Sequence, residues 1–234
     1  MLIHVGQERT ERINLALAGM LATIAGALNA AGFLAAGVFT ANMTGNVSAF
    51  ADYLVTGEYA LALWLVPLVV AFVLGAYSAA ALVYHELARR VHGAFAWAIV
   101  VEACLLIVLS AGLAFASGGV SAALMTITLS FVMGFQNAVT TLISEARVRT
   151  THVSGMATDI GIGLASLASD AEGRREAAAR LKLHALTLST FAVGGILGAI
   201  VFNWVGIWFF AIAAGALLLI GLPEIVRARR LGRG

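Results

Sequence analysis

The chain has 234 residues, of which 61% are hydrophobic and 11% are charged. A soluble domain has about 45–50% apolar and about 25% charged residues, so this composition excludes a soluble globular domain and a disordered chain. The single cysteine, Cys104, excludes a disulfide framework. With a mean hydropathy of +0.97, the chain is predicted to be an integral membrane protein. Its formal charge of +2 does not indicate a nucleic-acid partner.

Six stretches are long and apolar enough to be membrane spans, since a transmembrane helix needs about 20 mostly apolar residues. In chain order they are Ile13–Ala36, Ala60–Tyr84, Ala94–Ala116, Ser121–Ser144, Leu183–Phe202 and Trp204–Leu222. None contains Lys or Arg, and Glu102 is the only acid among them. Their sustained length without alternation excludes a barrel. We therefore expect an all-α protein whose residues 1–234 form a single membrane domain.

Two semi-apolar segments, Thr40–Val55 and Thr150–Ala168, are rich in Gly, Ser, Thr and Asn. They are either short spans or re-entrant half-helices, over about 43–55 and 154–168. If neither crosses and the N-terminus is cytoplasmic, all 14 Lys and Arg residues lie on the cytoplasmic side. If both cross, Arg89, Arg90, Arg147 and Arg149 move outside. The positive-inside rule favours six spans, with both termini and a basic tail (223–234) in the cytoplasm.

The two halves of the chain resemble each other. Gly26-Ala-Leu-Asn29-Ala30 reappears as Gly134-Phe-Gln-Asn137-Ala138, and Thr40-Ala-Asn-Met-Thr44-Gly45 reappears as Thr150-Thr-His-Val-Ser154-Gly155. The first repeat covers residues 13–116 and the second covers 121–222. Three crossings in each half are an odd number, so that the second half is upside down relative to the first. Such 3+3 inverted-topology repeats are common in transporters, and they bring the two half-helices together near the bilayer midplane.

The segment Phe39-Thr40-Ala41-Asn42-Met43-Thr44-Gly45-Asn46, together with Asn29-Ala-Ala-Gly-Phe, resembles the YoaK-type family of bacterial membrane proteins. The resemblance extends over nearly the whole chain, and it includes Gly134–Ala138 and Thr151–Gly155. Where many relatives have an aspartate beside the alanine, this chain has Asn29, which removes a charge from that position. The resemblance implies a six-helix inner-membrane protein of an uncharacterised family. It supplies no substrate.

The two polar segments each look like a break followed by a helix start, for which Thr44 and Ser154 are the expected N-caps. A helix N-terminus carries about half a positive charge and free N–H groups. Two such ends at the midplane would bind an anion or a polar neutral solute, and a protonated His152 would favour an anion. The alternative is that these residues only cap two kinks. The candidate solute-binding residues are Asn29, Thr40, Asn42, Thr44, Gly45, Asn46, Gln136, Asn137, Thr151, His152, Ser154 and Gly155.

Buried amides and acids in apolar helices need partners or a function. Asn29, Gln136 and Asn137 either hold helices together, or bond the broken backbone of a half-helix, or line the solute path. Glu102 lies mid-span, where a carboxylate commonly marks a proton or ion pathway. Glu102 and Asp159 are therefore the candidates for proton coupling, with a simple hydrogen-bonded acid as the alternative for Glu102.

The leading hypothesis is a channel or secondary transporter for a small polar or anionic solute, with no catalytic residues, cofactor, metal or nucleic-acid partner. The chain has no Walker A, H-E-x-x-H or G-x-S-x-G motif. A second hypothesis is a non-transporting scaffold or partner subunit. It would form a homo-oligomer whose protomers contact each other through the small-residue face Gly194–Gly198. A third is an intramembrane enzyme that uses His152, Asp159 and Glu102 as acid/base groups.

Overall fold

The computed structural model describes residues 1–3, 5, 9–88, 93–116, 118–168 and 170–231. Over these ranges the chain is helical and contains no strand. The helices are α1 (Glu11–Ala36), α2 (Met43–Thr56), α3 (Tyr59–Ala88), α4 (Ala94–Phe115), α5 (Gly118–Ile143), α6 (Val153–Ser166), α7 (Ala171–Val205), the short 3-10 helix η2 (Gly206–Trp208) and α8 (Phe209–Leu231). Of the arginines used to predict the topology, Arg89, Arg90 and Arg233 lie outside these ranges.

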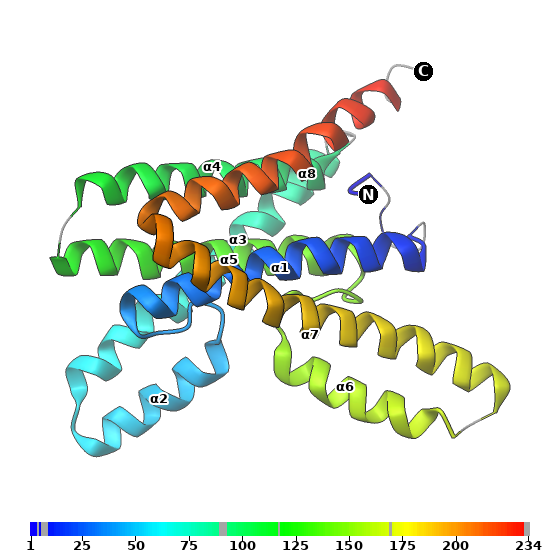
Figure 1. The fold of residues 1–234 in the computed structure, drawn as a ribbon, viewed down its shortest axis with the longest axis horizontal. Coiled ribbons are helices and arrows are strands. Elements are labelled where there is room, and N and C mark those ends of the chain that lie inside the picture. Colours follow the sequence, from blue (N-terminus) through cyan, green and yellow to red (C-terminus); the bar gives the residue numbers. More distant parts are fainter. Residues whose placement is uncertain (4, 6–8, 89–92, 117, 169, 232–234) are drawn as a thin grey trace.

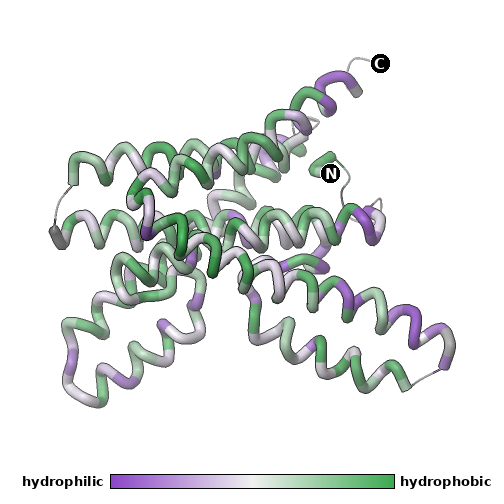
Figure 2. The backbone as a smooth tube through the Cα atoms, viewed as in Figure 1, coloured by the Kyte–Doolittle hydropathy of each residue, from purple (hydrophilic) through white to green (hydrophobic). Residues whose placement is uncertain are grey.

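Five helical stretches have the length and composition of membrane spans: Glu11–Ala36, Tyr59–Leu87, Ala94–Phe115, Val120–Ile143 and Glu172–Arg230. The last of these has 59 residues and covers α7, η2 and α8. Within it the direction of the chain changes at Gly206, whose φ of 57° and ψ of −132° end α7. Figure 2 shows apolar residues along most of each long helix, with hydrophilic residues concentrated towards the N-terminal part of α7 and the end of α8. The protein therefore has the character of a multi-pass membrane protein.

Two pairs of helices diverge from a common centre. Figure 1 shows α4 and α8 side by side, and α1 and α5 nearby, while α2 with the start of α3 and α6 with the start of α7 form two arms that point apart. The most extensive packing joins α1 to α7 and α3 to α5, so that each half of the chain packs against the other. The N-terminal ends of α2 and α6 both lie where the arms begin, at the centre of the molecule.

Glycines allow the two most extensive helix contacts. At the α1–α7 crossing, a Cβ on Gly26 would lie 2.0 Å from the Phe191 carbonyl oxygen, and a Cβ on Gly194 would lie 2.1 Å from that of Thr23. Any side chain there would overlap backbone, so only glycine lets these helices approach so closely.

The α3–α5 crossing is built in the same way. A Cβ on Gly134 would lie 1.9 Å from the Phe72 carbonyl oxygen, and a Cβ on Gly75 would lie 2.0 Å from that of Phe131. Each crossing thus has one glycine from either helix, and each glycine lies against a backbone carbonyl of the other helix.

Three boundaries differ from those predicted. Helix α7 begins at Ala171, ahead of the predicted Leu183, because Asp170 caps it by accepting a hydrogen bond from the Gly173 N–H at 2.8 Å. Trp204 and Trp208 do not begin the last span, since α7 continues through Trp204 and α8 starts at Phe209. The predicted basic tail from residue 223 is instead the continuation of α8 as far as Leu231.

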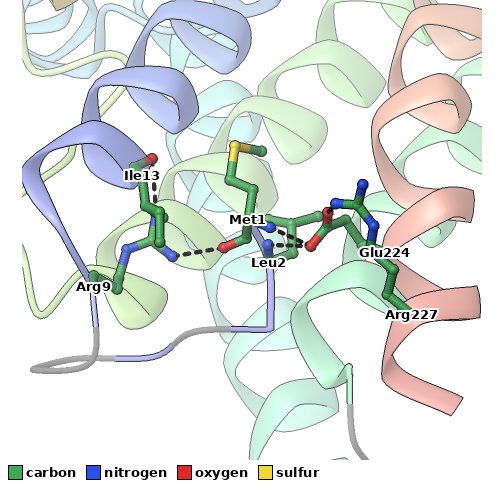
Figure 3. Close-up of polar contacts among 6 residues, drawn as sticks. All are labelled: Met1, Leu2, Arg9, Ile13, Glu224 and Arg227. Atoms are coloured by element: carbon green, nitrogen blue, oxygen red, sulfur yellow. Dashed lines mark hydrogen bonds and ion pairs between the residues drawn. The ribbon is translucent and has the colours of Figure 1, made fainter. Parts of the chain in front are cut away.

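The first residues of the chain pack beside the end of α8 (Figure 3). The Glu224 carboxylate forms an ion pair with the Met1 nitrogen, accepts a hydrogen bond from the Leu2 N–H at 2.8 Å, and accepts another from Arg227 at 2.9 Å. Arg9 donates to the Met1 carbonyl and to Asn14 Oδ1. These contacts place residues 1–2 and the C-terminal part of α8 at the same end of the molecule.

Candidate functional site

A cavity of about 610 Å³ lies where the N-terminal ends of α2 and α6 meet. Seven of the twelve predicted solute-binding residues line it: Asn29, Asn42, Thr44, Asn137, Thr151, His152 and Ser154. They come from both halves of the chain, in α1, α5 and the starts of α2 and α6. We call this the central cavity. Thr40, Gly45, Asn46, Gln136 and Gly155 lie close to it in sequence but do not line it.

The start of α2 is capped by Asn42, whereas the sequence analysis predicted Thr44. The Asn42 Oδ1 accepts a hydrogen bond from the Gly45 N–H at 3.1 Å, so that the N-cap lies two residues before Thr44 and the helix begins at Met43. A Cβ on Gly45 would lie 2.3 Å from Asn42 Nδ2, so a side chain there would displace the capping amide. Asn46 is buried and its amide donates to the Phe39 carbonyl at 3.3 Å, which anchors the turn before the helix.

The start of α6 has His152 in the N-cap position, whereas Ser154 was predicted there. The imidazole makes no capping hydrogen bond. Instead, Arg149 Nη1 lies 3.1 Å from His152 Nδ1. Arginine has no acceptor, so that Nδ1 accepts and the ring proton of a neutral imidazole lies on Nε2. A Cβ on Gly155 would lie 2.5 Å from His152 Nε2, so this glycine makes room for the ring. The two half-helices therefore start with an amide in one half and an imidazole in the other.

The side-chain oxygens of the two repeat-related asparagines differ in their hydrogen bonding. Asn29 Oδ1 accepts a hydrogen bond from the Ala41 N–H at 3.0 Å, so that α1 holds the irregular backbone before α2, which was one of the predicted alternatives. Asn137 Oδ1 is buried and has no hydrogen-bond partner, although the residue lines the central cavity. A buried amide oxygen without a partner costs about 1–3 kcal/mol, so Asn137 is the residue of the pair with a hydrogen-bond acceptor to offer.

Glu102 of α4 and Gln136 of α5 are both fully buried. Gln136 lies beside the Glu102 carboxylate, but among the described residues neither carboxylate oxygen has a hydrogen-bond partner, nor does Gln136 Nε2. Gln136 Oε1 accepts from Thr150 Oγ1 at 3.4 Å. Thr150 directly precedes Thr151, which lines the cavity. Thr40, the counterpart of Thr150, is buried with a free hydroxyl and packs against Gly32.

Three phenylalanines that were not predicted as site residues line the central cavity: Phe39, Phe72 and Phe191. Phe72 of α3 and Phe191 of α7 form a pair, because their carbonyl oxygens contact Gly134 and Gly26 at the two helix crossings. An apolar residue in an apolar span carries no signal of its own. The repeat could have revealed this pair, because the two residues occupy matching places in the two crossings.

Asp159 lies in two further cavities on the α6–α7 side. One of about 180 Å³ is lined by Arg147, Arg149, His152, Asp159, His184 and Thr187, together with apolar residues. The other, of about 450 Å³, lies among the start of α1, the later part of α6 and the N-terminal part of α7, and is also lined by Asp159. Asp159 Oδ2 is 3.6 Å from His184 Nε2, which joins α6 to α7. Glu102 lines none of these three cavities, so the three acid/base groups of the enzyme hypothesis do not share one pocket.

The small-residue face Gly194–Gly198 packs within the chain. Gly194 and Gly198 contact Thr23 and Ala27 of α1, so that this surface is already used and does not provide a contact between protomers. A homo-oligomer through another surface stays a prediction.

The sequence matches the family described as "Protein of unknown function (DUF1275)" over residues 17–222. No curated protein and no solved structure matches the chain. The family has no assigned activity, as expected from the resemblance to an uncharacterised family, and the match covers both sequence repeats.

Proposed function

Since the chain belongs to this family of unknown function, we propose its function from the site itself: a transport protein of the bacterial inner membrane, secondary transporter or channel, for a small polar or anionic solute. The observation that carries the proposal is the central cavity, where polar side chains from both halves meet at two half-helix N-termini. Backbone N–H groups and the helix dipoles at these ends favour negative or polar groups. Transporters commonly bind solutes between broken helices in this way.

The helix crossings support an inverted repeat. Gly26 contacts Phe191, and Gly134, 108 residues after Gly26, contacts Phe72. Phe72 and Phe191 are 119 residues apart, as are Gly75 and Gly194 at the same two crossings. Swapping the halves therefore reproduces the same contacts, as a two-fold axis would. In this arrangement α1, α3 and α4 correspond to α5, α7 and α8, and counting α7 and α8 separately gives six crossings.

Helix lengths support a re-entrant arrangement of α2 and α6. Each has 14 residues, which makes about 21 Å of helix, short of the roughly 30 Å hydrocarbon core. Both begin at the centre and run outwards along the arms (Figure 1). Residues 1–2 contact the end of α8. An even number of crossings agrees with this contact, because it places both ends of the chain on the same side of the membrane. The positive-inside rule then makes that side cytoplasmic.

Single cysteines test this topology. In a Cys104→Ala background, Ser48→Cys in α2 is expected to react with an impermeant maleimide from the external side, and Ile160→Cys in α6 from the cytoplasmic side. The reason is that re-entrant segments are wetted from the face through which they enter. Labelling in right-side-out and inside-out vesicles is the measurement. Labelling of Ser48→Cys only from the cytoplasm would overturn the arrangement.

Solute flux tests the transport proposal. Protein reconstituted in liposomes is expected to move at least one solute among glycerol, urea, acetate and phosphate, measured by light scattering after an osmotic step. Ala157 lines the central cavity, and Ala157→Trp is expected to lower that flux to the level of protein-free liposomes because the indole fills the cavity. Ala165→Trp, on an exposed position of the same helix, is the matched control. If Ala157→Trp retains full flux, the cavity is not the path.

A further inference from the structure

The central cavity is continued along α6 by two further cavities that basic residues line. The cavity of about 180 Å³ shares His152 with the central cavity, and it shares Arg147, Asp159 and His184 with the cavity of about 450 Å³. We call the smaller one the connecting cavity and the larger one the basic pocket. The α6 residues that line the three cavities run from Ser154 in the central cavity through Asp159 to Ser166 in the basic pocket. This direction follows the arm that α6 forms with α7 (Figure 1).

Arginines outnumber acids among the residues that line the connecting cavity and the basic pocket: Arg9, Arg147, Arg149 and Arg180 against Glu11 and Asp159. Burial lowers the pKa of Arg9 to about 10, so that it is still a cation at neutral pH. Glu11 pairs with Lys182 at 3.1 Å, and Asp159 lies 3.6 Å from the His184 imidazole. Arg180 lies 3.7 Å from Glu176 in an exposed pair on α7.

Arg149 lines the connecting cavity and contacts His152, a residue that this cavity shares with the central cavity. Among the described residues, no carboxylate lies within 4.0 Å of Arg149, and its guanidinium donates to His152 Nδ1 instead. The neighbouring Arg147 has only a loose, exposed contact with Glu145 at 4.0 Å. The turn that carries both arginines holds Glu145 and Ala146 at positive φ of 51° and 63°, a conformation that is unfavourable for residues other than glycine. The chain therefore accepts some strain where it presents these two charges.

The other half of the repeat has no such charges. With the offset of 110 between the half-helix segments, Arg147, Arg149 and Asp159 correspond to Gly37, Phe39 and Ala49. With the offset of 119 between α3 and α7, His184 corresponds to Leu65. Packing requirements are shared by both repeats, so that they do not explain a difference between them. The positive-inside rule accounts for basic residues on this side of the membrane. What distinguishes Arg149 is its contact with His152, a residue that lines the central cavity.

We infer that the connecting cavity and the basic pocket form an entrance for a small anion of the carboxylate or oxyanion class, with Arg149 of the connecting cavity as its recognition residue. The inference rests on the proposed transport function and narrows its solute to an anion. A guanidinium matches the planar geometry of carboxylates and oxyanions and pairs with them by two parallel hydrogen bonds. The N–H groups at the start of α6 provide further donors.

Calorimetric titration of the purified protein tests the inference, with acetate, phosphate and sulfate as the anionic probes and glycerol and urea as the neutral ones. At least one of the three anions is expected to bind. Arg149→Gln is expected to weaken that binding by about 10–100-fold, as expected for loss of a hydrogen bond between charged groups. Arg149→Lys keeps the charge and loses the planar guanidinium. Its affinity for the anion is expected to lie between that of the parent protein and that of Arg149→Gln. Arg175→Gln, an exposed arginine of α7 outside all three cavities, is the control and should leave the affinity unchanged.

The outcomes separate the inference from the transport proposal. Flux of glycerol or urea without binding of any of the three anions overturns the anionic entrance and leaves the transport proposal standing. Anion binding that depends on Arg149, with no flux of any solute in liposomes, overturns the transport proposal and leaves the anion site. Equal affinity in Arg149→Gln and Arg175→Gln shows that bound anions lie elsewhere, and it overturns the inference.

Discussion

Gly134→Ala is expected to destabilise the protein by at least about 3 kcal/mol, at the upper end of what overpacking costs. The added methyl group would lie 1.9 Å from the Phe72 carbonyl oxygen and 2.7 Å from its carbonyl carbon. Because both atoms belong to the backbone of α3, no side-chain rotation can relieve the overlap, and the two helices must move apart. The measurement is unfolding of the purified protein by titration with sodium dodecyl sulfate in a mild detergent, followed by circular dichroism.

The matched control is Gly215→Ala in α8. No atom outside its own helix lies within 4 Å of a Cβ at this position, so the variant is expected to be as stable as the parent or up to about 1 kcal/mol more stable, since alanine favours a helix over glycine. Gly26→Ala, the counterpart at the α1–α7 crossing, should be as severe as Gly134→Ala. Equal stability of Gly134→Ala and Gly215→Ala would show that the α3–α5 contact is looser than described.

Glu102→Gln is expected to abolish proton movement that accompanies solute flux while leaving the protein folded. The fully buried carboxylate has no hydrogen-bond partner among the described residues. It lies beside Gln136, whose Oε1 accepts from Thr150, the residue before Thr151 of the central cavity. A mid-membrane carboxylate is costly to insert, by roughly 2.5–3.5 kcal/mol on insertion scales for charged residues. Glutamine has the same shape but cannot take up or release a proton. A pH-sensitive dye inside proteoliposomes reports the proton movement.

Glu58→Gln, at an exposed acid just before α3, is the control for this experiment and should leave proton movement unchanged. Solute binding in Glu102→Gln should also stay unchanged, because Glu102 does not line the central cavity. Proton movement that survives in Glu102→Gln would assign this residue a structural role. It would then direct the search for a proton carrier to Asp159, the other predicted candidate.

The positions of the half-helices could be predicted because polar, glycine-rich segments interrupt otherwise apolar sequence. Helix α2 was expected over about 43–55 and spans Met43–Thr56, and α6 was expected over about 154–168 and spans Val153–Ser166. Their N-caps were wrong by two residues. Asn42 and Thr44 are both good capping residues by composition, and the choice between them depends on where the Asn29–Ala41 hydrogen bond fixes the preceding backbone.

Composition and the local pattern by themselves determined a helical membrane protein, the extents of most helices, and seven residues that line one cavity. These features follow from burial of apolar side chains and from backbone hydrogen bonding, which act along neighbouring residues. Only the tertiary structure decided that Phe72 and Phe191 complete the cavity, that Gly194 and Gly198 pack inside the chain, and that Arg147, Arg149, Asp159 and His184 line one route. Those residues come from helices far apart in sequence, and their proximity depends on the helix crossings.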